Sequence, residues 1–506
     1  MYKRQTRDES TTALKTAAEN FRNTAENVTN YVIKIINKAT GNDNTLNVTL
    51  ENVNIDVSRE YKDAALSVEG EGNTTITLKG NNNLTSGDGH AGLEHNEKSK
   101  DGSSSVDTGK LTITSEKDSG ILTATGGSGA AGIGSSNGKG TGTIEITGGN
   151  ITANGGNGGN GGDNGAGIGS GSMATGNTNI TISGGTVKAQ GGGNGAGIGS
   201  GSMAAGNTNI IISGGTIEEA VGGSTGDGIG GGNSSRNITV TIQGGTIKKA
   251  QGGNGGNGYG GNGIHSDSTL NISGQASIQN ATGGSGKYGG DGIRSNSPLN
   301  IFGQASIQKA TGGSGIYNHG KLTIFGGTIG TAQGGEGKSS GSGNGGHGIY
   351  SKTMEILGGI IQKAIGGNAN GNTCTGGSGI HSDGTLTISG GEIQQATGGD
   401  STGISGKGGT GIRGDQVVKI SGGAIGSAKG GSGDSGGAGI GTGAKPAFAT
   451  EINISGGTIT EATGGTGGAG IGSGSNSSTA TTINIIGGTI KNATGTDLSL
   501  IHISEP

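Results

Sequence analysis

This sequence has few of the residues that stabilise small secreted proteins or anchor proteins in membranes. Its 506 residues include no tryptophan, three prolines and one cysteine, and aromatic residues make up 2%. The single cysteine, Cys374, excludes a disulfide bond within the chain. No apolar run reaches the roughly 18 residues of a membrane-spanning helix, so no membrane span is predicted. The net charge of −4 is near neutral for this length and gives no basic surface for nucleic acid.

Hydrophobic residues are also scarce, at 27%, whereas glycine accounts for 125 residues. Taken alone, such a composition is typical of disordered or low-complexity chains. The few aliphatic residues nevertheless recur at regular intervals, and this periodicity argues against disorder. A narrow core of small and β-branched side chains needs no aromatic residues, so the composition agrees with an ordered repeat protein.

One repeated phrase organises the chain. NGAGIGSGSMATGNTNITISGG ends at Gly185, and the nearly identical NGAGIGSGSMAAGNTNIIISGG ends at Gly215. Self-similarity with a period of about 20–50 residues indicates a solenoid, a propeller or an array. The spacing of the copies is loose, which favours a solenoid whose corners accept insertions. Equivalent positions of the ISGG-like phrase mark the copies at Gly149, Gly185, Gly215, Gly245, Gln275, Gln304, Gly327, Gly359, Gly391, Gly423, Gly457 and Gly488.

Each copy contains three short apolar segments separated by glycine-rich turns. In the first segment aliphatic residues alternate, as at Ile180 and Ile182, which predicts a strand with one face inward. The second carries an aliphatic residue and then an alanine, as at Val187 and Ala189, and the third is an isoleucine next to glycine, as at Ile198. Three strands per repeat predict an all-β fold, a single right-handed parallel β-helix of about 15 turns stacked ~4.8 Å apart.

The turns differ along the chain. Residues 45–136 are expected to form N-terminal β-helix turns that carry more charge than the rest, because the open end of a solenoid is an exposed sheet edge. Residues 137–497 are expected to form the glycine-rich turns. Residues 6–44 are predicted to be a linker or an N-terminal cap.

Both ends of the sequence look artificial. MYKRQ, residues 1–5, reverse-translates to a string that is the reverse complement of the start of the string for LSLIHISEP, residues 498–506, and together they match a transposon-end sequencing adapter. We therefore expect adapter-derived ends on a metagenomic fragment, with any secretion signal or anchor lost by truncation. These residues are excluded from reasoning about the fold.

Several phrases resemble a known family. Residues 74–94 read TTITLKGNNNLTSGDGHAGLE, and residues 109–136 read GKLTITSEKDSGILTATGGSGAAGIGSS. Serial ISGGTI, ATGG and GAGIG phrases follow them. Together, over most of the chain, they resemble the carbohydrate-binding-domain-type β-helix regions of large gut Firmicutes surface proteins. The resemblance implies an extracellular, wall-attached, adhesin-like bacterial protein, and it brings the expectation of carbohydrate binding.

The third segment contains the clearest departure from the repeat. In the outer copies glycine follows the isoleucine, as at Gly199 and Gly441, whereas six consecutive middle copies carry larger side chains there. Because the isoleucine points inward, its neighbour should point outward. Aromatic and arginine side chains on a rigid face suit contacts with glycans or with host extracellular matrix. The predicted ligand-binding ladder consists of His265, Arg294, Tyr317, Tyr350, His381 and Arg413.

A second column departs in the same copies. Two positions before the isoleucine, the outer copies have alanine, whereas the middle copies carry Asp227, Asn262, Asp291, Ser314, His347, Ser378 and Thr410. Sequence drift at a solvated corner, combined with ordinary side-chain stacking, is the competing explanation for both columns. In that case the chain is a structural spacer without a ligand.

A polysaccharide lyase or hydrolase on the β-helix fold is the remaining alternative. Paired catalytic carboxylates must lie within about 5–9.5 Å of one another. Asp267 and Asp383 share a column but are four turns apart, and Asp227 and Asp291 are two turns apart, so no catalytic pair is predicted. Tandem calcium-binding nonapeptides are absent. We therefore expect a non-enzymatic protein with no catalytic residues, no metal site and no cofactor.

Overall fold

The structure is a computed structural model of the chain. It describes residues 30–39, 45–59, 62–100, 104–106, 108–116, 119–158, 162–337, 343–444, 450–477 and 481–496. The two predicted adapter segments, residues 1–5 and 498–506, and most of the predicted linker lie outside the described residues.

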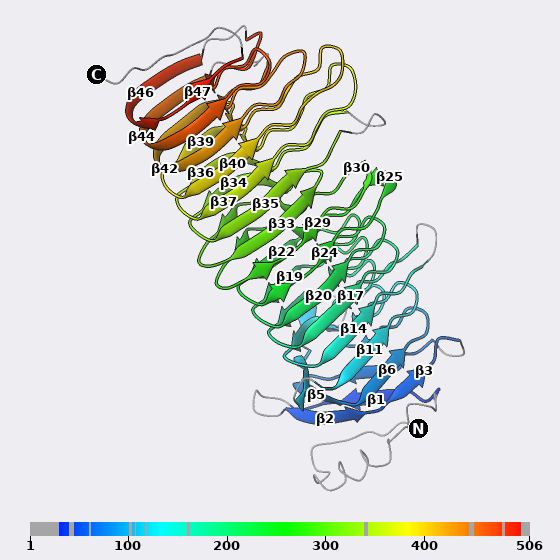
Figure 1. Cartoon of the computed structure of the whole chain (residues 1–506). Coiled ribbons are helices and arrows are strands. Elements are labelled where there is room, and N and C mark those ends of the chain that lie inside the picture. The colour runs from blue at the N-terminus through cyan, green and yellow to red at the C-terminus, as the bar shows by residue number, and fades with distance from the viewer. Residues whose placement is uncertain are drawn as a thin grey trace. The chain divides into compact units, whose positions relative to one another are not determined.

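The described residues are all-β, and parallel strands stack as a β-helix of about 14 turns, which confirms the predicted fold class. Each turn contributes three strands, and each strand pairs with its equivalent in the next turn (Figure 1). The chain divides into two compact units. Unit 1 comprises residues 1–255 and 260–267, and unit 2 comprises residues 256–259 and 268–506.

In unit 1 the strands form three parallel columns. The first column contains β2 (Leu46–Glu51), β5 (Thr74–Lys79), β10 (Leu111–Ser115), β13 (Gly142–Ile146), β16 (Thr178–Ile182), β19 (Thr208–Ile212) and β22 (Ile238–Ile242). The second contains β3 (Asn54–Asp56), β6 (Asn81–Thr85), β11 (Ile121–Thr125), β14 (Asn150–Asn154), β17 (Thr186–Gln190), β20 (Thr216–Val221), β23 (Thr246–Ile247) and β24 (Ala250–Gln251). The third contains β1 (Ile33–Ile36), β4 (Leu66–Glu69), β7 (Leu93–Glu94), β12 (Ile133–Gly134), β15 (Ile168–Gly169), β18 (Ile198–Gly199), β21 (Ile229–Gly230) and β26 (Ile264–Ser266).

Pairing within unit 1 is continuous across the boundary predicted at residues 136 and 137. Strand β10 pairs with β5 on one side and with β13 on the other. Strand β1 falls in the segment predicted to be a linker or cap, and it pairs with β4 as the first strand of the stack.

In unit 2 the same three columns recur, but some strands run around a corner. The single-column strands are β27 (Leu270–Ile272), β28 (Ser277–Ile278), β29 (Ala281–Thr282), β31 (Ile293–Ser295), β32 (Leu299–Ile301), β33 (Ser306–Gly312), β35 (Thr328–Gly334), β37 (Ile360–Ile365), β38 (Ile380–Ser382), β39 (Thr385–Ile388), β40 (Glu392–Thr397), β41 (Ile412–Gly414), β43 (Ile440–Gly441), β45 (Ile471–Gly472) and β47 (Ala493–Thr494). The strands that join two columns are β34 (Ile316–Ile324), β36 (Ile349–Ile356), β42 (Val417–Lys429), β44 (Thr450–Thr463) and β46 (Thr481–Ile490).

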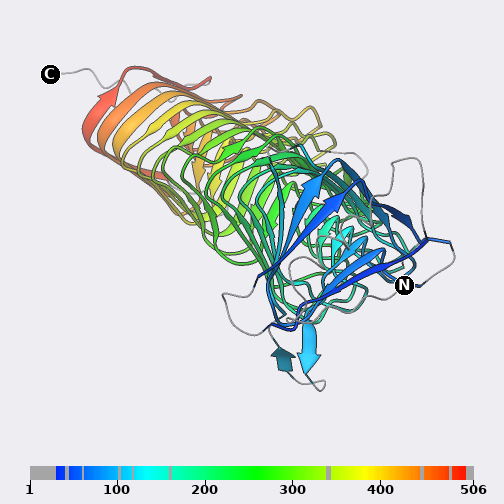
Figure 2. The same cartoon turned by 90° about the horizontal axis from the view of Figure 1, so that it is seen from below.

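Two small sheets lie outside these columns. In unit 1, β8 (Lys98–Lys100) and β9 (Ser104–Val106) form an antiparallel hairpin that projects from the stack (Figure 2). In unit 2, β25 (Gly256–Tyr259) and β30 (Gly286–Tyr288) pair in parallel. Both insertions arise where the chain between two column strands is longer than usual, and they leave the stacking of the columns intact.

The core of each unit consists of aliphatic columns. Strands such as β16 alternate between buried and half-buried residues, as their sequence predicts, because successive side chains point to opposite faces. Ile180 and Ile182 stack on Ile210 and Ile212 of the next turn, and all four are at most 1% exposed. The alternation of a large aliphatic residue and an alanine in the second strand, as at Ile217 and Ala220, keeps the core narrow.

The ISGG corner explains why glycine marks the phase of the repeat. The second glycine of this phrase has a positive φ, for example +73° at Gly185 and +70° at Gly215. Only glycine adopts this conformation without a steric cost. A Cβ atom at Gly185 would also lie 2.8 Å from the backbone of Gly148 in the neighbouring turn. Copies with two glycines therefore need the second for its backbone conformation and for the close approach of successive turns, whereas in the copies with Gln275 and Gln304 the positive φ falls on Gly274 and Gly303.

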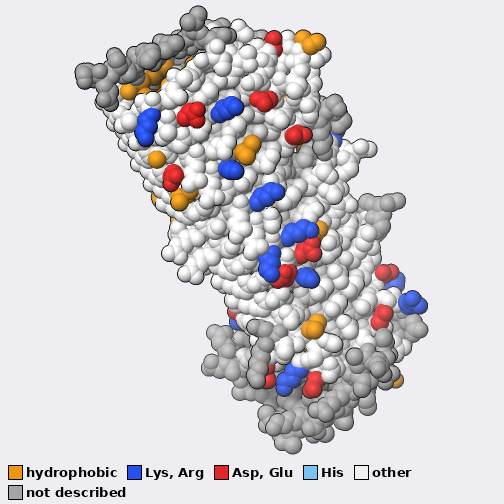
Figure 3. Space-filling view, viewed as in Figure 1, with side chains coloured by type: hydrophobic (Ala, Val, Ile, Leu, Met, Phe, Trp, Pro, Cys, Tyr) orange, Lys and Arg blue, Asp and Glu red, His pale blue; other side chains and the backbone are white. Residues whose placement is uncertain are grey.

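Charged side chains are few and lie mostly on the outside, set among polar and backbone atoms (Figure 3). Several form ion pairs between equivalent positions of neighbouring turns, as Lys248 and Lys249 do with Glu218 and Glu219. These four side chains are 30–46% exposed, and such pairs contribute about 0–1 kcal/mol each. Among the described residues, no helix is long and apolar enough to cross a membrane.

Truncation of one core isoleucine tests this account of stability. Ile393 is 1% exposed in its column, whereas Ile404, in the loop that follows, is 79% exposed. We expect Ile393→Ala to lower the free energy of unfolding by about 2–5 kcal/mol, because it leaves a cavity between stacked turns. The matched change Ile404→Ala should stay within about 0.5 kcal/mol of the parent. Urea unfolding followed by circular dichroism measures both, and equal effects would contradict the assignment of the core.

Candidate functional site

From β12 onward the third strands are of two kinds, whereas β1, β4 and β7 carry Lys34, Ser67 and Glu94 at this position. In one kind, isoleucine is followed by a glycine with φ between +134° and +149°: Gly134, Gly169, Gly199, Gly230, Gly441 and Gly472. A Cβ atom at Gly199 would lie 1.8 Å from the carbonyl oxygen of Gly230 in the next turn. The same clash, at 1.7–1.9 Å, occurs at Gly134, Gly169 and Gly441, so these four turns exclude a side chain at this position for steric reasons that are independent of function.

In the other kind, a larger residue follows the isoleucine, and the strand is extended. Strands β26, β31, β38 and β41 continue one residue beyond the two-residue strands of the glycine type. None of the six predicted ladder residues is among the described residues with positive φ. The change from glycine to a side chain is therefore a change of backbone conformation, which the sequence analysis did not foresee.

The column two positions before the isoleucine compensates for this change of backbone conformation. In glycine-type turns the amide of the alanine two positions before the isoleucine donates within its own turn, as Ala196 does to the carbonyl of Ser200. In three of the six side-chain turns, at Asn262, Ser314 and Ser378, the equivalent amide instead donates to a side chain of the preceding turn. Asp227 accepts from the Asn262 amide at 2.7 Å, Asp291 from Ser314 at 2.6 Å, and His347 Nδ1 from Ser378 at 2.9 Å. At these three turns the second column therefore supplies an acceptor for the amide that no longer bonds within its own turn.

Five of the six predicted residues form one ladder in unit 2. Arg294 pairs in register with Tyr317, Tyr317 with Tyr350, Tyr350 with His381, and His381 with Arg413. We call this set the ladder. The structure thus brings together five residues that are spread over more than 100 positions of the sequence. The sixth predicted residue, His265, belongs to unit 1.

The ring faces of the ladder are occupied by its own members. The rings of Tyr317 and Tyr350 stack with centroids 4.6 Å apart and planes at 15°, and the Arg294 guanidinium lies 5.1 Å from the centroid of Tyr317. His381 meets Tyr350 edge-on at 5.3 Å, and His347 stacks on Tyr350 at 5.6 Å. The ladder therefore presents ring edges and polar ends, rather than open ring faces, to solvent.

A chain of hydrogen bonds links residues at the C-terminal end of the ladder. Because His347 Nδ1 accepts from Ser378, the proton of the neutral ring lies on Nε2, which is 3.3 Å from His381 Nδ1. His381 Nε2 then donates to Asp415 Oδ2 at 3.3 Å and lies 3.6 Å from Asp383 Oδ1. The network thus determines the tautomers of both imidazoles.

The remaining oxygens of the two carboxylates have partners of their own. Arg413 Nε donates to Asp415 Oδ1 at 2.5 Å, and the Tyr350 hydroxyl donates to Asp383 Oδ2. Burial opposes ionisation of Asp415, but the hydrogen bond from His381 and the charge of Arg413 outweigh it and lower the pKa of Asp415 to about 2. Asp415 is therefore a carboxylate at neutral pH. Burial is also the largest cause that lowers the pKa of His347 and of His381.

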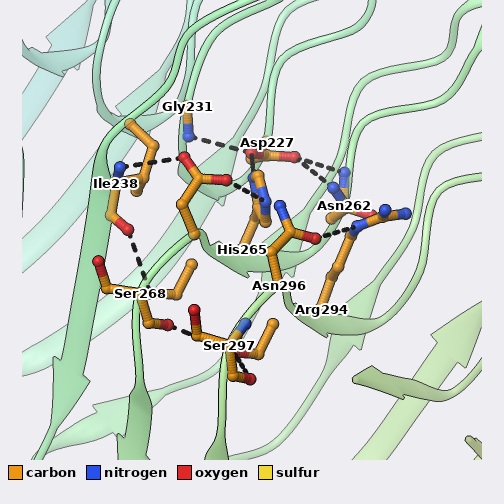
Figure 4. Close-up of polar contacts among 12 residues, drawn as sticks. Asp227, Gly231, Ile238, Asn262, His265, Ser268, Arg294, Asn296 and Ser297 are labelled. Atoms are coloured by element: carbon orange, nitrogen blue, oxygen red, sulfur yellow. Dashed lines mark hydrogen bonds and ion pairs between the residues drawn. The ribbon is translucent and has the colours of Figure 1, made fainter. Parts of the chain in front are cut away.

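His265 in unit 1 has a different environment. Its Nδ1 atom lies 2.9 Å from Asp227 Oδ2 and its Nε2 atom 3.4 Å from Asp267 Oδ1 (Figure 4). Asp227 also accepts from the Gly231 amide at 3.0 Å, so this carboxylate, 7% exposed, is held from several sides. Burial alone would lower the pKa of His265, but the negative charges of Asp227 and Asp267 and the hydrogen bonds that His265 donates to them outweigh burial and raise the pKa to about 9.

Unit 2 also carries exposed aromatic rings outside the ladder. Tyr259 and Tyr288, on the small β25–β30 sheet, are 69% and 45% exposed, and their rings stack at 4.7 Å. Lys287 Nζ lies 5.5 Å from the centroid of Tyr288. We call these three residues the flap. Four of the seven tyrosines of the chain therefore lie on the ladder or the flap.

Sequence reasoning missed the flap and the cluster of His381, Asp383 and Asp415. The flap interrupts the repeat, so periodicity gives no alignment for its tyrosines. A signal for the carboxylates was present, because Asp267, Asp383 and Asp415 each stand two positions after a ladder position. From the sequence, Asp383 was compared with Asp267, in a distant copy, and not with Asp415 in the next turn.

Comparisons with protein-family models, with curated proteins and with solved structures find no match to this chain.

The steric role of the third-strand glycine gives a direct test. We expect Gly199→Ala to destabilise unit 1 by at least about 1–3 kcal/mol, because φ is +140° and the new Cβ atom meets the backbone of the next turn. The control Arg294→Ala, at the equivalent position of a side-chain turn, should have a smaller effect on the unfolding midpoint. Similar midpoints for the two variants would contradict the distinction between the two kinds of strand.

The environment of His265 predicts a pH dependence. A folded-state pKa of about 9, above the ordinary 6.5, stabilises the fold below pH ~6.5, and this contribution is lost as pH rises through ~9. The loss should be of the order of 3 kcal/mol. We expect the urea midpoint to fall between pH 6 and pH 10 in the parent and to fall much less in His265→Gln. The same slope in the variant would show that other groups cause the dependence.

Proposed function

We propose that this chain is a non-enzymatic bacterial surface protein, a β-helical stalk or adhesin, and that unit 2 binds carbohydrate through the ladder. The observation that carries the proposal is the ladder itself. Consecutive turns place arginine, tyrosine and histidine in register on one strip, where the turns with Gly134, Gly169, Gly199, Gly230, Gly441 and Gly472 have glycine. The proposed extracellular location rests on the sequence resemblance to surface proteins.

The ladder would recognise a glycan mainly by hydrogen bonding. Its ring faces are occupied and the His381 side chain is only 8% exposed, so hydroxyl, guanidinium and carboxylate groups are what the ladder offers to sugar hydroxyls. These groups are fixed by β-pairing and by contacts with one another, so little conformational entropy is lost when a ligand binds. A rigid row of polar groups suits an extended ligand that runs along the stack.

The flap supplies what the ladder lacks. Tyr259 is 69% exposed and has one ring neighbour, Tyr288, so one face of its ring remains available. Flat aromatic surfaces bind the apolar CH face of a sugar ring, and their polar edges contact its hydroxyls. We therefore include the flap in the proposed carbohydrate site.

The ionisation of Asp415 argues against a role as a general acid. A general acid must carry a proton near the working pH, and the pKa of Asp415, about 2, leaves it ionised. Asp383, its neighbour, is engaged by Tyr350 and His381. Neither carboxylate is therefore assigned a catalytic role in the proposal.

A glycan array tests the proposal with the full chain. The parent should bind at least one glycan class, and the combined change of Arg294, Tyr317, Tyr350, His381 and Arg413 to alanine should abolish binding. Tyr350→Phe, which removes one hydroxyl, should weaken it by about tenfold or less. Tyr259→Ser with Tyr288→Ser should weaken it separately. Lys248→Ala with Lys249→Ala, on unit 1, is the control and should bind like the parent.

Circular dichroism and melting temperature establish that each variant is folded. Binding that survives both the ladder and the flap changes would place the carbohydrate site elsewhere and would contradict the proposal. A parent that binds no glycan on the array would leave the structural spacer as the better interpretation.

A further inference from the structure

Three potential metal-ligand atoms converge at the C-terminal end of the ladder. His381 Nε2 lies 3.3 Å from Asp415 Oδ2 and 3.6 Å from Asp383 Oδ1, and one ligand atom from each residue lies within 4.8 Å of the others. Zinc bonds nitrogen and oxygen at about 2.0–2.2 Å, so neighbouring tetrahedral ligands lie about 3.4 Å apart. The two histidine distances fit this spacing. We propose that His381, Asp383 and Asp415 bind a divalent transition-metal ion, with zinc the best fit.

The other polar atom of each ligand already has a partner that orients it. Tyr350 holds Asp383 Oδ2, Arg413 holds Asp415 Oδ1, and His347 lies against His381 Nδ1. The three atoms that remain are those that face one another. Metal sites in proteins share this arrangement, because partners of the ligands fix their orientation and tune their basicity.

The donor set selects the class of metal. Zinc and similar borderline ions accept imidazole nitrogen and carboxylate oxygen together, whereas calcium and magnesium prefer oxygen alone. Two carboxylates and one arginine leave a net negative charge beside the imidazole, which favours a cation. Three protein ligands also leave a fourth position for water or for an oxygen of a bound molecule.

Unit 1 contains a matched control. His265, Ser266 and Asp267 repeat the order of His381, Ser382 and Asp383. In unit 1, however, the position that corresponds to His347 is Asp227, whose carboxylate contacts His265 Nδ1 at 2.9 Å. This imidazole lies between two carboxylates, and the described residues bring only Asp267 to its Nε2 atom among potential metal ligands. The two histidine sites therefore share the His-Ser-Asp motif. They differ in the potential metal ligands that face the Nε2 atom, which are Asp383 and Asp415 for His381 and Asp267 for His265.

Metal binding requires a change in the positions of protons. In the network described above, His381 carries its proton on Nε2, and the metal must replace it there. The ring then carries a proton on Nδ1, which faces the protonated Nε2 of His347. An aspartate at position 347 would remove this conflict. In the same column, Asp291 accepts a hydrogen bond from the backbone amide of the next turn, as His347 does now. Asp227, also in this column, accepts a hydrogen bond from an imidazole, as the metal-bound His381 would require. We therefore expect His347→Asp to raise metal affinity.

Isothermal titration of the full chain, stripped with chelator, tests the proposal with Zn²⁺ and with Co²⁺. The parent should bind one ion per chain at this site, and bound Co²⁺ should give a visible absorption spectrum. Asp383→Asn, Asp415→Asn and His381→Ala should each weaken binding by more than about tenfold. The control His265→Ala, in unit 1, should leave the affinity unchanged. None of these readouts depends on glycan binding.

The side chain of Asp383 is 46% exposed, so Asp383→Asn keeps the test meaningful even if changes at the buried His381 impair folding. The proposal is overturned if the parent takes up neither ion, or if uptake by folded Asp383→Asn and Asp415→Asn equals that of the parent. A lower metal affinity in His347→Asp would contradict the inference that the Nε2 proton of His347 opposes metal binding by His381.

Discussion

Stacking of parallel turns about 4.8 Å apart is the constraint on which every other feature of this protein depends. A single turn buries only a few aliphatic side chains and cannot offset the conformational entropy of some thirty residues. Each position therefore has an equivalent position directly above and below it. Apolar positions become core columns such as Ile180 and Ile210, and outward positions become ladders.

The same constraint couples changes that look independent in the sequence. A glycine such as Gly199 is required where the carbonyl of the next turn approaches within van der Waals distance, and a side chain is tolerated only where the strand becomes extended. Extension displaces a backbone donor, which then needs an acceptor from the preceding turn, such as Asp291 or His347. At such turns the substitutions in the two columns are therefore coupled.

Periodicity explains how much could be predicted. Strands, core columns and the register from Arg294 to Arg413 follow from counting, because equivalent residues must stack. Counting does not show where a side chain points within its turn, so the occupied ring faces of Tyr317 and Tyr350 were not foreseen. It also fails where the period is broken, as at the flap. The convergence of Asp383 and Asp415 requires both register and side-chain direction, and the sequence supplies only the first.

The two histidine sites show how a repeat fold diversifies its chemistry. His265 and His381 occupy the same column and are followed by the same Ser-Asp pair. The Asp227 carboxylate, which contacts His265 Nδ1, makes His265 a cation between two carboxylates. The His347 imidazole, which contacts His381 Nδ1, leaves His381 neutral beside Asp415. The difference resides in the preceding turn, where Asp227 or His347 stands, and in the following copy, where Asn296 corresponds to Asp415. Because each turn supplies the environment of the next, a single substitution alters the chemistry of its neighbour without disturbing the stack that positions both.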